Sequence, residues 1–306
     1  VDGSASAATI TIAATAADLS DTAGAFTGGT GSSDEIQITV DGTTIAGPDT
    51  ASWSGFEKIT TVDDLGTLTL TTAAGNVAAG ATLTINATSL VTESLIFVGT
   101  AETSTTPGHF AITASGGSAN RIITLGSGND SYTSTSTGAD VVVATAGANI
   151  ISTGDGADDI TMGTGVDNVT AGAGNDTITV ATANLASTDT IAGGLGTDSL
   201  IMSAASTVVD AEFTLITGVE TLSYGNNAAT ITLGAAAGAG GYLPRLLREP
   251  HAPGRRARQL QHAARLEHGA QRARDDDVPL RAFPTRPGED RQELPGIRPL
   301  PHRLER

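Results

Sequence analysis

The sequence predicts an all-β fold made of short strands that stack on one another between tight turns. Three observations support this prediction. The pattern Gly, any, Gly, any, Asp, any, large residue recurs through residues 126–200, and short runs of alternating Thr and Ile or Leu lie on both sides of it. The 306-residue chain has 38 glycines, which suit sharp turns, while strict alternation of polar and apolar residues is typical of strands.

The first segment, residues 1–53, is predicted to be an N-terminal β segment. Residues 9–13 and 36–40 alternate between apolar and polar side chains, as half-buried strands do. Asp41-Gly42 lies between two such runs, and an Asp-Gly pair in that place predicts a β-hairpin. Residues 15–34 show no alternation and are expected to form a loop or an irregular edge.

A second internal similarity lies outside the repeated pattern. Residues 54–60 match residues 217–223, and each segment contains Gly-x-Glu. Without a gap the match continues to the alternating runs at 67–70 and 230–233, and residues 93–97 resemble a third copy. The same kind of unit therefore lies on both sides of the repeat, and we expect it to form metal-free solenoid coils that continue the stack.

Those coils are assigned to residues 54–115 and 206–241. Glu57 and Glu220 stand at matching places in them and are the first candidates for catalytic carboxylates. A polar residue that ends a strand is the favoured interpretation of both.

The repeat itself occupies residues 116–205. Its acidic places follow one another at steps of 10, 9, 9, 9, 9, 13 and 9 residues, at Asp130, Asp140, Asn149, Asp158, Asp167, Asp176, Asp189 and Asp198. Two places after each stands a large residue: Tyr132, Val142, Ile151, Ile160, Val169, Ile178, Ile191 or Leu200. We expect these to point inward, and units must stack because one alone cannot bury its own core residue. Residues 116–122 are interpreted as a degenerate leading copy with Asn120 in the acidic place.

This run of copies resembles the calcium-binding nonapeptide repeat of RTX, or hemolysin-type, proteins. The resemblance implies a right-handed parallel β-solenoid, the RTX β-roll, in which two nine-residue units make one coil. Residues 18 apart would then lie above one another. On that arrangement Asp140, Asp158 and Asp176 line one edge, with Asn149 and Asp167 on the other.

Stacked carboxylates about 4.8 Å apart would repel one another unless a cation lay between them. Calcium accepts six to eight oxygen ligands, including carboxylates and backbone carbonyls, whereas magnesium demands a tighter octahedron. We therefore expect several calcium ions. The predicted metal-site residues are Gly126, Gly128, Asp130, Gly138, Asp140, Gly147, Asn149, Gly154, Gly156, Asp158, Gly163, Gly165, Asp167, Gly172, Gly174, Asp176, Gly194, Gly196 and Asp198.

Three places in the repeat are expected to be weak or empty sites. Asn149 is neutral, the turn at Gly138 has Ser136 where a first glycine belongs, and Asp189 follows Ser187 where glycine belongs.

Residues 242–306 differ in composition from the rest. They hold 14 of the 16 Lys and Arg residues and show no strand alternation. Such a sequence is typical of a GC-rich gene read out of frame, and the alternative is a basic, disordered tail that binds an acidic surface. A short helix at 258–274 is the one element that its composition favours. The chain starts at Val1 rather than Met and is interpreted as a fragment.

Residues 1–241 exclude several classes of function. Their net charge is 2 − 24 = −22, which argues against a nucleic-acid partner. They contain no cysteine and no apolar stretch of about 18 residues, so disulfides and a transmembrane helix are not expected. Neither His-Glu-x-x-His nor Gly-x-Ser-x-Gly occurs, and His109, the only histidine there, is expected in a loop. We therefore expect no enzyme activity.

Over residues 1–241, Gly-x-Glu units around an RTX block in a chain poor in Lys and Cys resemble the surface-layer and giant adhesin proteins of Gram-negative bacteria. The resemblance implies a calcium-stabilised structural segment, exported by type I secretion to the bacterial cell surface. Self-association in a surface array is the expected partnership, with cell-surface polysaccharide a further candidate. The alternatives are the calcium-rigidified stalk of an RTX adhesin and the RTX module of a secreted enzyme whose catalytic domain lies elsewhere.

Overall fold

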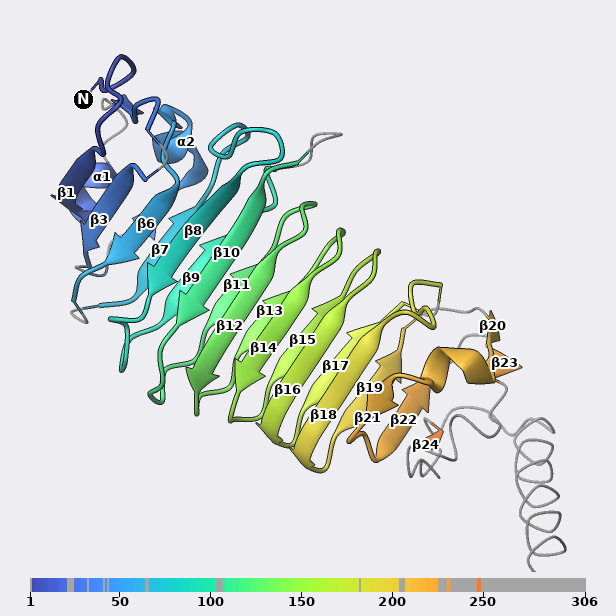
Figure 1. The fold of residues 1–306 in the computed structure, drawn as a ribbon. Helices are drawn as coiled ribbons and strands as arrows, with labels where there is room; N and C mark the ends of the chain where they lie inside the picture. Colours follow the sequence, from blue (N-terminus) through green and yellow to red (C-terminus); the bar gives the residue numbers. More distant parts are fainter. Residues whose placement is uncertain are drawn as a thin grey trace, which may run out of the picture. The chain divides into compact units, whose positions relative to one another are not determined.

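The computed structural model describes residues 2–20, 25–31, 33–40, 42, 44–63, 66–102, 107–181, 183–203, 207–224, 230–231 and 247–248. Contacts divide the chain into a unit of residues 1–252 and a second unit of residues 253–306. All described residues belong to the first unit, whose strands follow one another along a single stack (Figure 1).

Two parallel ten-stranded sheets make up this stack. Sheet 1 consists of β1 (Thr11–Thr15), β3 (Glu35–Thr39), β6 (Lys58–Thr61), β8 (Thr82–Ala87), β10 (His109–Ala114), β12 (Ser131–Ser136), β14 (Ile150–Gly154), β16 (Asn168–Gly174), β18 (Thr190–Gly196) and β21 (Ile216–Thr217). Sheet 2 consists of β4 (Thr44–Ile45), β7 (Leu68–Thr71), β9 (Leu95–Val98), β11 (Ile122–Thr124), β13 (Val141–Val143), β15 (Asp159–Met162), β17 (Thr177–Val180), β19 (Ser199–Met202), β22 (Thr221–Tyr224) and β24 (Leu247–Arg248). Most coils give one strand to each sheet, which confirms the predicted parallel β-solenoid.

One unbroken row of inward side chains runs through each sheet. In sheet 1 the paired residues are Ile12, Ile36, Ile59, Ile85, Ile112, Tyr132, Ile151, Val169, Ile191 and Ile216. In sheet 2 they are Ile45, Leu70, Phe97, Ile123, Val142, Ile160, Ile178, Leu200 and Leu222. All are buried, so the eight inward residues predicted from the repeat are confirmed.

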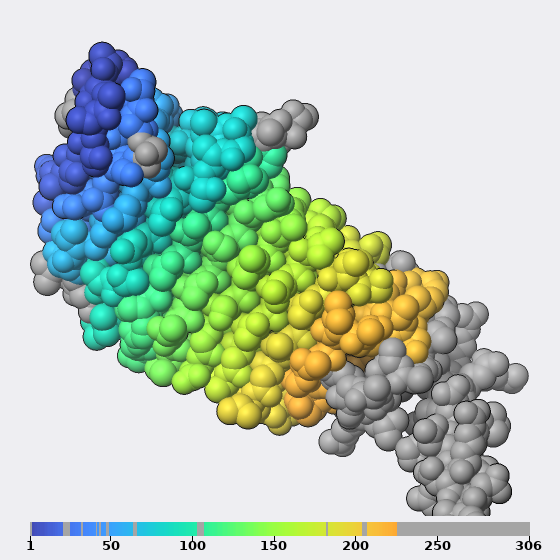
Figure 2. Space-filling model, in the orientation of Figure 1, coloured from blue at the N-terminus to red at the C-terminus, as the bar shows by residue number. Residues whose placement is uncertain are grey.

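The two rows confirm the predicted coil length of 18 residues in the middle of the repeat, whereas the later step from Val169 to Ile191 is 22 residues. Val142 pairs with Ile160 and Ile160 pairs with Ile178, each step being 18 residues. The coils outside the repeat are longer but keep the same register, as the pairing of Ile36 with Ile59 shows. Figure 2 shows the successive coils as adjoining bands across one face of this unit.

The hairpin predicted at Asp41-Gly42 is wrong. The flanking strands β3 and β4 belong to different sheets, and each pairs in parallel with other strands. Gly42 has a φ of 82°, so the glycine does make a turn, but the turn carries the chain from one sheet to the other. An Asp-Gly turn suits a hairpin and a connection between two sheets equally well. Only the stacking of the flanking strands against neighbouring coils decides between the two.

The N-terminal segment contains more structure than its sequence predicts. A short helix, α1 (Ala16–Leu19), falls inside the expected loop 15–34 and is capped by a reciprocal contact between Thr15 and Asp18. Two further turns of helix, α2 (Gly47–Thr50) and the 3₁₀ turn η1 (Asp210–Phe213), lie in connections between coils. Two small parallel pairs complete the described elements: β2 (Phe26–Thr27) with β5 (Trp53–Ser54), and β20 (Thr207–Val208) with β23 (Thr230–Ile231).

Most of the tail from residue 242 lies outside the described residues, the predicted helix at 258–274 included. Leu247–Arg248 are described, and they pair with β22 as strand β24. The interpretation of the tail as a disordered segment is therefore wrong at these two residues.

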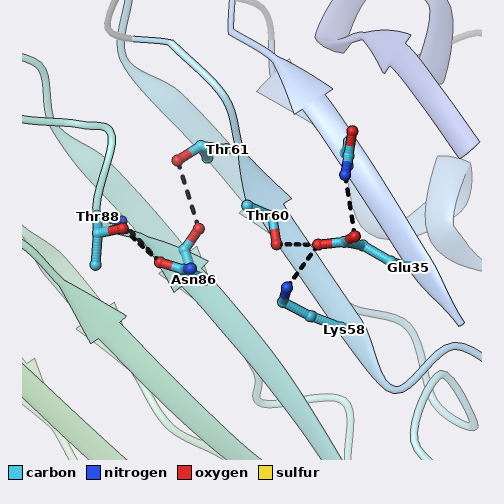
Figure 3. Close-up of polar contacts among 7 residues, drawn as sticks. Glu35, Lys58, Thr60, Thr61, Asn86 and Thr88 are labelled. Atoms are coloured by element: carbon cyan, nitrogen blue, oxygen red, sulfur yellow. Dashed lines mark hydrogen bonds and ion pairs between the residues drawn. The ribbon is translucent and has the colours of Figure 1, made fainter. Parts of the chain in front are cut away.

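Polar side chains cover part of the outer face where the coils are long (Figure 3). Lys58 Nζ on β6 lies 2.8 Å from Glu35 Oε1 on the neighbouring strand β3, and the Thr60 hydroxyl donates to the same carboxylate. The Lys58 ammonium holds the pKa of Glu35 below its usual value. Lys58, one of the two basic residues in 1–241, is therefore paired with Glu35 outside the repeat.

Candidate metal centre

The acidic residues of the repeat stand immediately before strands, in two columns. Column A precedes strands of sheet 1 and contains Asp130, Asn149, Asp167 and Asp189. Column B precedes strands of sheet 2 and contains Arg121, Asp140, Asp158, Asp176, Asp198 and Glu220. In the N-terminal coils, Asp34 and Glu57 occupy the position equivalent to column A, because each directly precedes a strand of sheet 1. Both columns follow from the strand register, because each of these residues sits one place before a paired strand residue.

Each column is held together by its own carboxylates. The backbone N–H of one member donates to a side-chain oxygen of the member in the next coil, at 2.7–3.0 Å. The stacked edges predicted for Asp140, Asp158 and Asp176, and for Asn149 and Asp167, are present as these two columns.

Glu57 and Glu220 belong to the same system. Glu57 accepts the N–H of Asp34 at 2.8 Å, and Glu220 accepts the N–H of Asp198 at 2.7 Å. The expectation that they end strands is wrong, since β6 starts directly after Glu57 and β22 directly after Glu220.

Glycine is required in the turns because carbonyls stack there. A Cβ on Gly174 would lie 1.5 Å from the carbonyl oxygen of Gly156, and one on Gly172 would lie 1.6 Å from that of Gly154. The same clash, at 1.8–3.0 Å, meets the other predicted glycines: Gly126, Gly128, Gly138, Gly147, Gly154, Gly156, Gly163, Gly165 and Gly194, with Gly196 at 1.5 Å. The turns therefore present rows of backbone oxygens beside the carboxylate columns.

Three carboxylate oxygens in column B are buried without a hydrogen-bond donor. They are the Oδ2 atoms of Asp158, Asp176 and Asp198, whose residues are at most 2% exposed. A buried carboxylate oxygen that lacks a donor is costly unless a cation compensates it. These three atoms fit calcium, which binds carboxylate and carbonyl oxygens together.

The donor set also favours calcium over zinc. Among the described residues, no three His, Cys, Asp or Glu side chains gather closely enough to hold a metal by themselves. Backbone carbonyls must therefore complete any site at these turns. Asp158, Asp176 and Asp198, with the turn carbonyls of Gly154, Gly172 and their equivalents, are the groups that would hold calcium, and it would supply the positive charge that the columns lack.

Asn149 shows what fills such a place when no cation does. Its Nδ2 donates to the carbonyls of Ala146 and Gly147, at 3.1 and 3.2 Å, and to Asp167 Oδ1 at 3.0 Å. One nitrogen thus bonds two turn carbonyls and the next carboxylate. These bonds give a physical reason to expect a weak site here, because the amide already bonds oxygens that a cation would use.

Arg121 plays the same part at the head of column B. Its side chain is fully buried, and its guanidinium donates to Ala119 O at 2.5 Å, to Leu90 O at 2.9 Å and to Ser115 O at 3.1 Å. Leu90 belongs to the preceding turn, so the cationic side chain joins carbonyls of two successive coils. The prediction that Asn120 holds the acidic place is wrong, since Arg121 N donates to Asp140 Oδ1 and Ile123, not Ile122, is the buried residue of β11.

Asp130, Asp140 and Asp189 have both oxygens occupied. Tyr132 donates its hydroxyl to Asp140 Oδ2 at 2.8 Å, Asp130 Oδ2 accepts from Gly126 N, and Asp189 Oδ2 accepts from Ala186 N. His109, expected in a loop, is the first residue of β10 and accepts the N–H of Asn129. Asp130, Asp140 and Asp189 therefore differ from Asp158, Asp176 and Asp198, each of which has a donor-free oxygen.

Burial and mutual repulsion raise the pKa of the column aspartates. Desolvation comes first in raising the pKa of Asp140 to about 6 and that of Asp176 to about 6, and the Asp158 and Asp198 carboxylates raise the Asp176 pKa further. Desolvation likewise raises the pKa of Asp130, Asp158, Asp167 and Asp198. Without a cation, the ionised form of these groups is less favoured than in a free aspartate.

A scan against protein families matches the RTX calcium-binding nonapeptide repeat, in 4 copies, at residues 134–167 and 162–180. No curated protein and no solved structure matches the chain. The matched residues include Asp140, Asn149, Asp158, Asp167 and Asp176, so the chain carries RTX repeats of the calcium-binding kind arranged as a β-roll. None of the helices described is long and apolar enough to cross a membrane.

Proposed function

We propose that the chain is a calcium-stabilised structural segment of a secreted, surface-layer-like bacterial protein. The observation that carries the proposal is the row of three donor-free carboxylate oxygens in column B, inside an otherwise continuous stack. These oxygens explain why a chain with so little positive charge in its body would need a divalent ion to hold successive coils together.

A structural role is favoured over catalysis by what the carboxylates already do. Each column acid accepts the backbone N–H of the coil before it, and this bond fixes the spacing of the coils. Glu57 and Glu220, the first catalytic candidates, are engaged in the same bonds. An acid that is buried and bonded to the main chain is a poor general acid or base, so we propose that the segment is not an enzyme.

The cell surface is the proposed location because calcium there is plentiful. Extracellular calcium modules bind at roughly 10⁻⁴ to 10⁻³ M. The calcium-dependent coils of the repeat would stay unfolded in the cytosol, and they would fold after the chain has passed through a type I secretion channel. Self-association into an array is the proposed partnership, and binding of surface polysaccharide would anchor it.

An adhesin stalk is the second candidate. The unbroken inward rows from Ile12 to Ile216 favour it, since a stack without interruption resists bending and suits a spacer. A carrier module for a secreted enzyme is the third candidate, and an adjoining catalytic domain in the parent gene would establish it.

Two measurements test the proposal on the full chain. Circular dichroism should show more β-structure in millimolar calcium than in chelator, with magnesium a poor substitute. Electron microscopy should show ordered two-dimensional sheets once calcium is added. An unchanged spectrum in the two conditions would refute calcium stabilisation, whereas single rods in place of sheets would favour the stalk.

A further inference from the structure

The Gly-x-Glu segment occurs twice, and both copies close a carboxylate column in the same way. Glu220 accepts the N–H of Asp198 at 2.7 Å, and Glu57 accepts the N–H of Asp34 at 2.8 Å. The turns beneath them match as well. A Cβ on Gly193 would lie 1.8 Å from the carbonyl oxygen of Gly218, and one on Gly28 would lie 1.8 Å from that of Gly55.

The two copies differ in the second oxygen of the aspartate. Asp34 is fully satisfied, since Oδ1 accepts from Ile10 N and Oδ2 accepts from Gly29 N. Asp198 Oδ1 accepts from Asp176 N, but its Oδ2 has no donor although the residue is 0% exposed. The C-terminal copy therefore leaves a buried negative oxygen without compensation, which the N-terminal copy avoids.

Other oxygens surround the same point. The position that a Gly193 Cβ would take is 1.8 Å from Gly218 O and 2.7 Å from Asp198 Oδ2, so a carbonyl and a carboxylate oxygen approach each other there. The Glu220 carboxylate lies beside them through its bond to Asp198 N, and its charge raises the pKa of Asp198 in addition to burial. Two carboxylates and a carbonyl form a hard oxygen set of the kind that calcium prefers.

We propose that Asp198, Glu220 and the Gly218 carbonyl form a calcium site that closes the array at its C-terminal end. The site lies beyond the matched repeats, which end at residue 180, and it uses glutamate where the repeat uses aspartate. The equivalent N-terminal place, Asp34 with Glu57, binds no calcium because the Gly29 N–H already compensates Asp34. This inference rests on the proposed calcium-stabilised fold.

The test compares two matched substitutions in the full chain, Glu220→Gln and Glu57→Gln. Glutamine keeps the oxygen that accepts the aspartate N–H and removes only the charge. Equilibrium dialysis with radioactive calcium should show one ion fewer per chain, or a last ion bound at least tenfold more weakly, for E220Q. E57Q should bind as the original chain does.

A second variant guards against a folding defect in E220Q. In Asp198→Asn the new amide can donate to turn carbonyls, as Asn149 does, so the β-structure should persist while one ion is lost. Unchanged calcium binding in E220Q or D198N, or equal losses in E220Q and E57Q, would overturn the inference. A chain that binds no calcium at all would instead overturn the proposed function, so the two failures are distinguishable.

Discussion

At the scale of the residue, the two oxygens of a column carboxylate have different partners. One oxygen accepts the N–H of the preceding coil in every case from Asp140 to Asp198. The second oxygen accepts a hydroxyl in Asp140 and a backbone N–H in Asp189, but nothing in Asp176. We therefore expect fewer strong calcium sites than there are acids in the repeat.

A comparison of Asp176→Asn with Asp189→Asn tests this distinction. Both substitutions preserve size and an oxygen acceptor, but only Asp176 has a donor-free oxygen. We expect D176N to weaken calcium binding by about tenfold or more, equivalent to about 1.4 kcal/mol, and D189N to change it little. Isothermal titration calorimetry gives both values, and equal losses would remove the distinction between the two sites.

Protonation of the column aspartates should partly replace calcium in stabilising the fold. The pKa of Asp140 and of Asp176 is about 6 in the metal-free fold against 3.8 for a free side chain, so folding takes up protons between these values. A raised acid pKa means stability that is greatest at low pH and falls as pH rises towards 6. Six column aspartates shift this way, whereas Glu35 and the exposed Asp2 shift the other way.

In chelator, the melting temperature should therefore be higher at pH 4.5 than at pH 7.5. In calcium the order should reverse, because the metal needs ionised ligands. Thermal melts followed by circular dichroism measure both. A chelated chain that is more stable at pH 7.5 would contradict the assignment of raised pKa values to the columns.

At the scale of the element, the turn is defined by close approach of backbones as well as by conformation. Gly174 has a φ of 147°, and its Cβ would lie 1.5 Å from Gly156 O, while Gly75 has a φ of 86° with nothing within 4 Å of its Cβ. Gly174→Ala should lower the free energy of unfolding by about 3 kcal/mol or more. Gly75→Ala should cost only about 1–2 kcal/mol, the strain of its dihedral. Chemical denaturation in calcium compares the two, and similar losses would show that stacking of carbonyls is unimportant.

The elements inside the repeat could be predicted from sequence because one period sets both turn and strand. The inward residues from Tyr132 to Leu200 follow from the spacing, and the stacking of Asp140, Asp158 and Asp176 follows from the resemblance to the RTX repeat. Helix α1 and the path at Gly42 could not be predicted in this way, because they depend on packing against other coils. The place of Arg121 at the head of column B was missed because the leading copy was aligned one residue too early, with Asn120 in the acidic place. A lone arginine in an acidic segment was a signal that could have revealed it. The matching Gly-x-Glu segments revealed a shared unit but not its place in the columns.

At the scale of the whole molecule, the described coils fall into two groups that are expected to differ in their dependence on calcium. Before Asp158, no buried carboxylate oxygen of the described residues lacks a donor, and from Asp158 to Asp198 three do. In solenoids each coil contacts only its neighbours, so one part can melt while another stays folded. The N-terminal coils should therefore persist without calcium.

Hydrogen exchange in chelator should show this boundary. We expect slow exchange in strands β3 to β10 and fast exchange in β15 to β19, with the second group becoming protected as calcium is added. Lys58→Met, which removes the exposed ion pair to Glu35, should leave the boundary in place, because such pairs contribute only about 0–1 kcal/mol. Uniform protection in chelator would show that all coils are stable by themselves.

The buried guanidinium of Arg121 has a mechanical consequence. It is a charge that cannot dissociate, so the coils it joins stay joined when calcium is withdrawn, and unravelling can only proceed from the other side. A folded coil of 18 residues adds about 4.8 Å to the stack, whereas the same residues pulled straight reach about 60 Å. The segment would then act as a tether whose length is set by the calcium concentration, because each coil released beyond this fixed stop becomes more than tenfold longer.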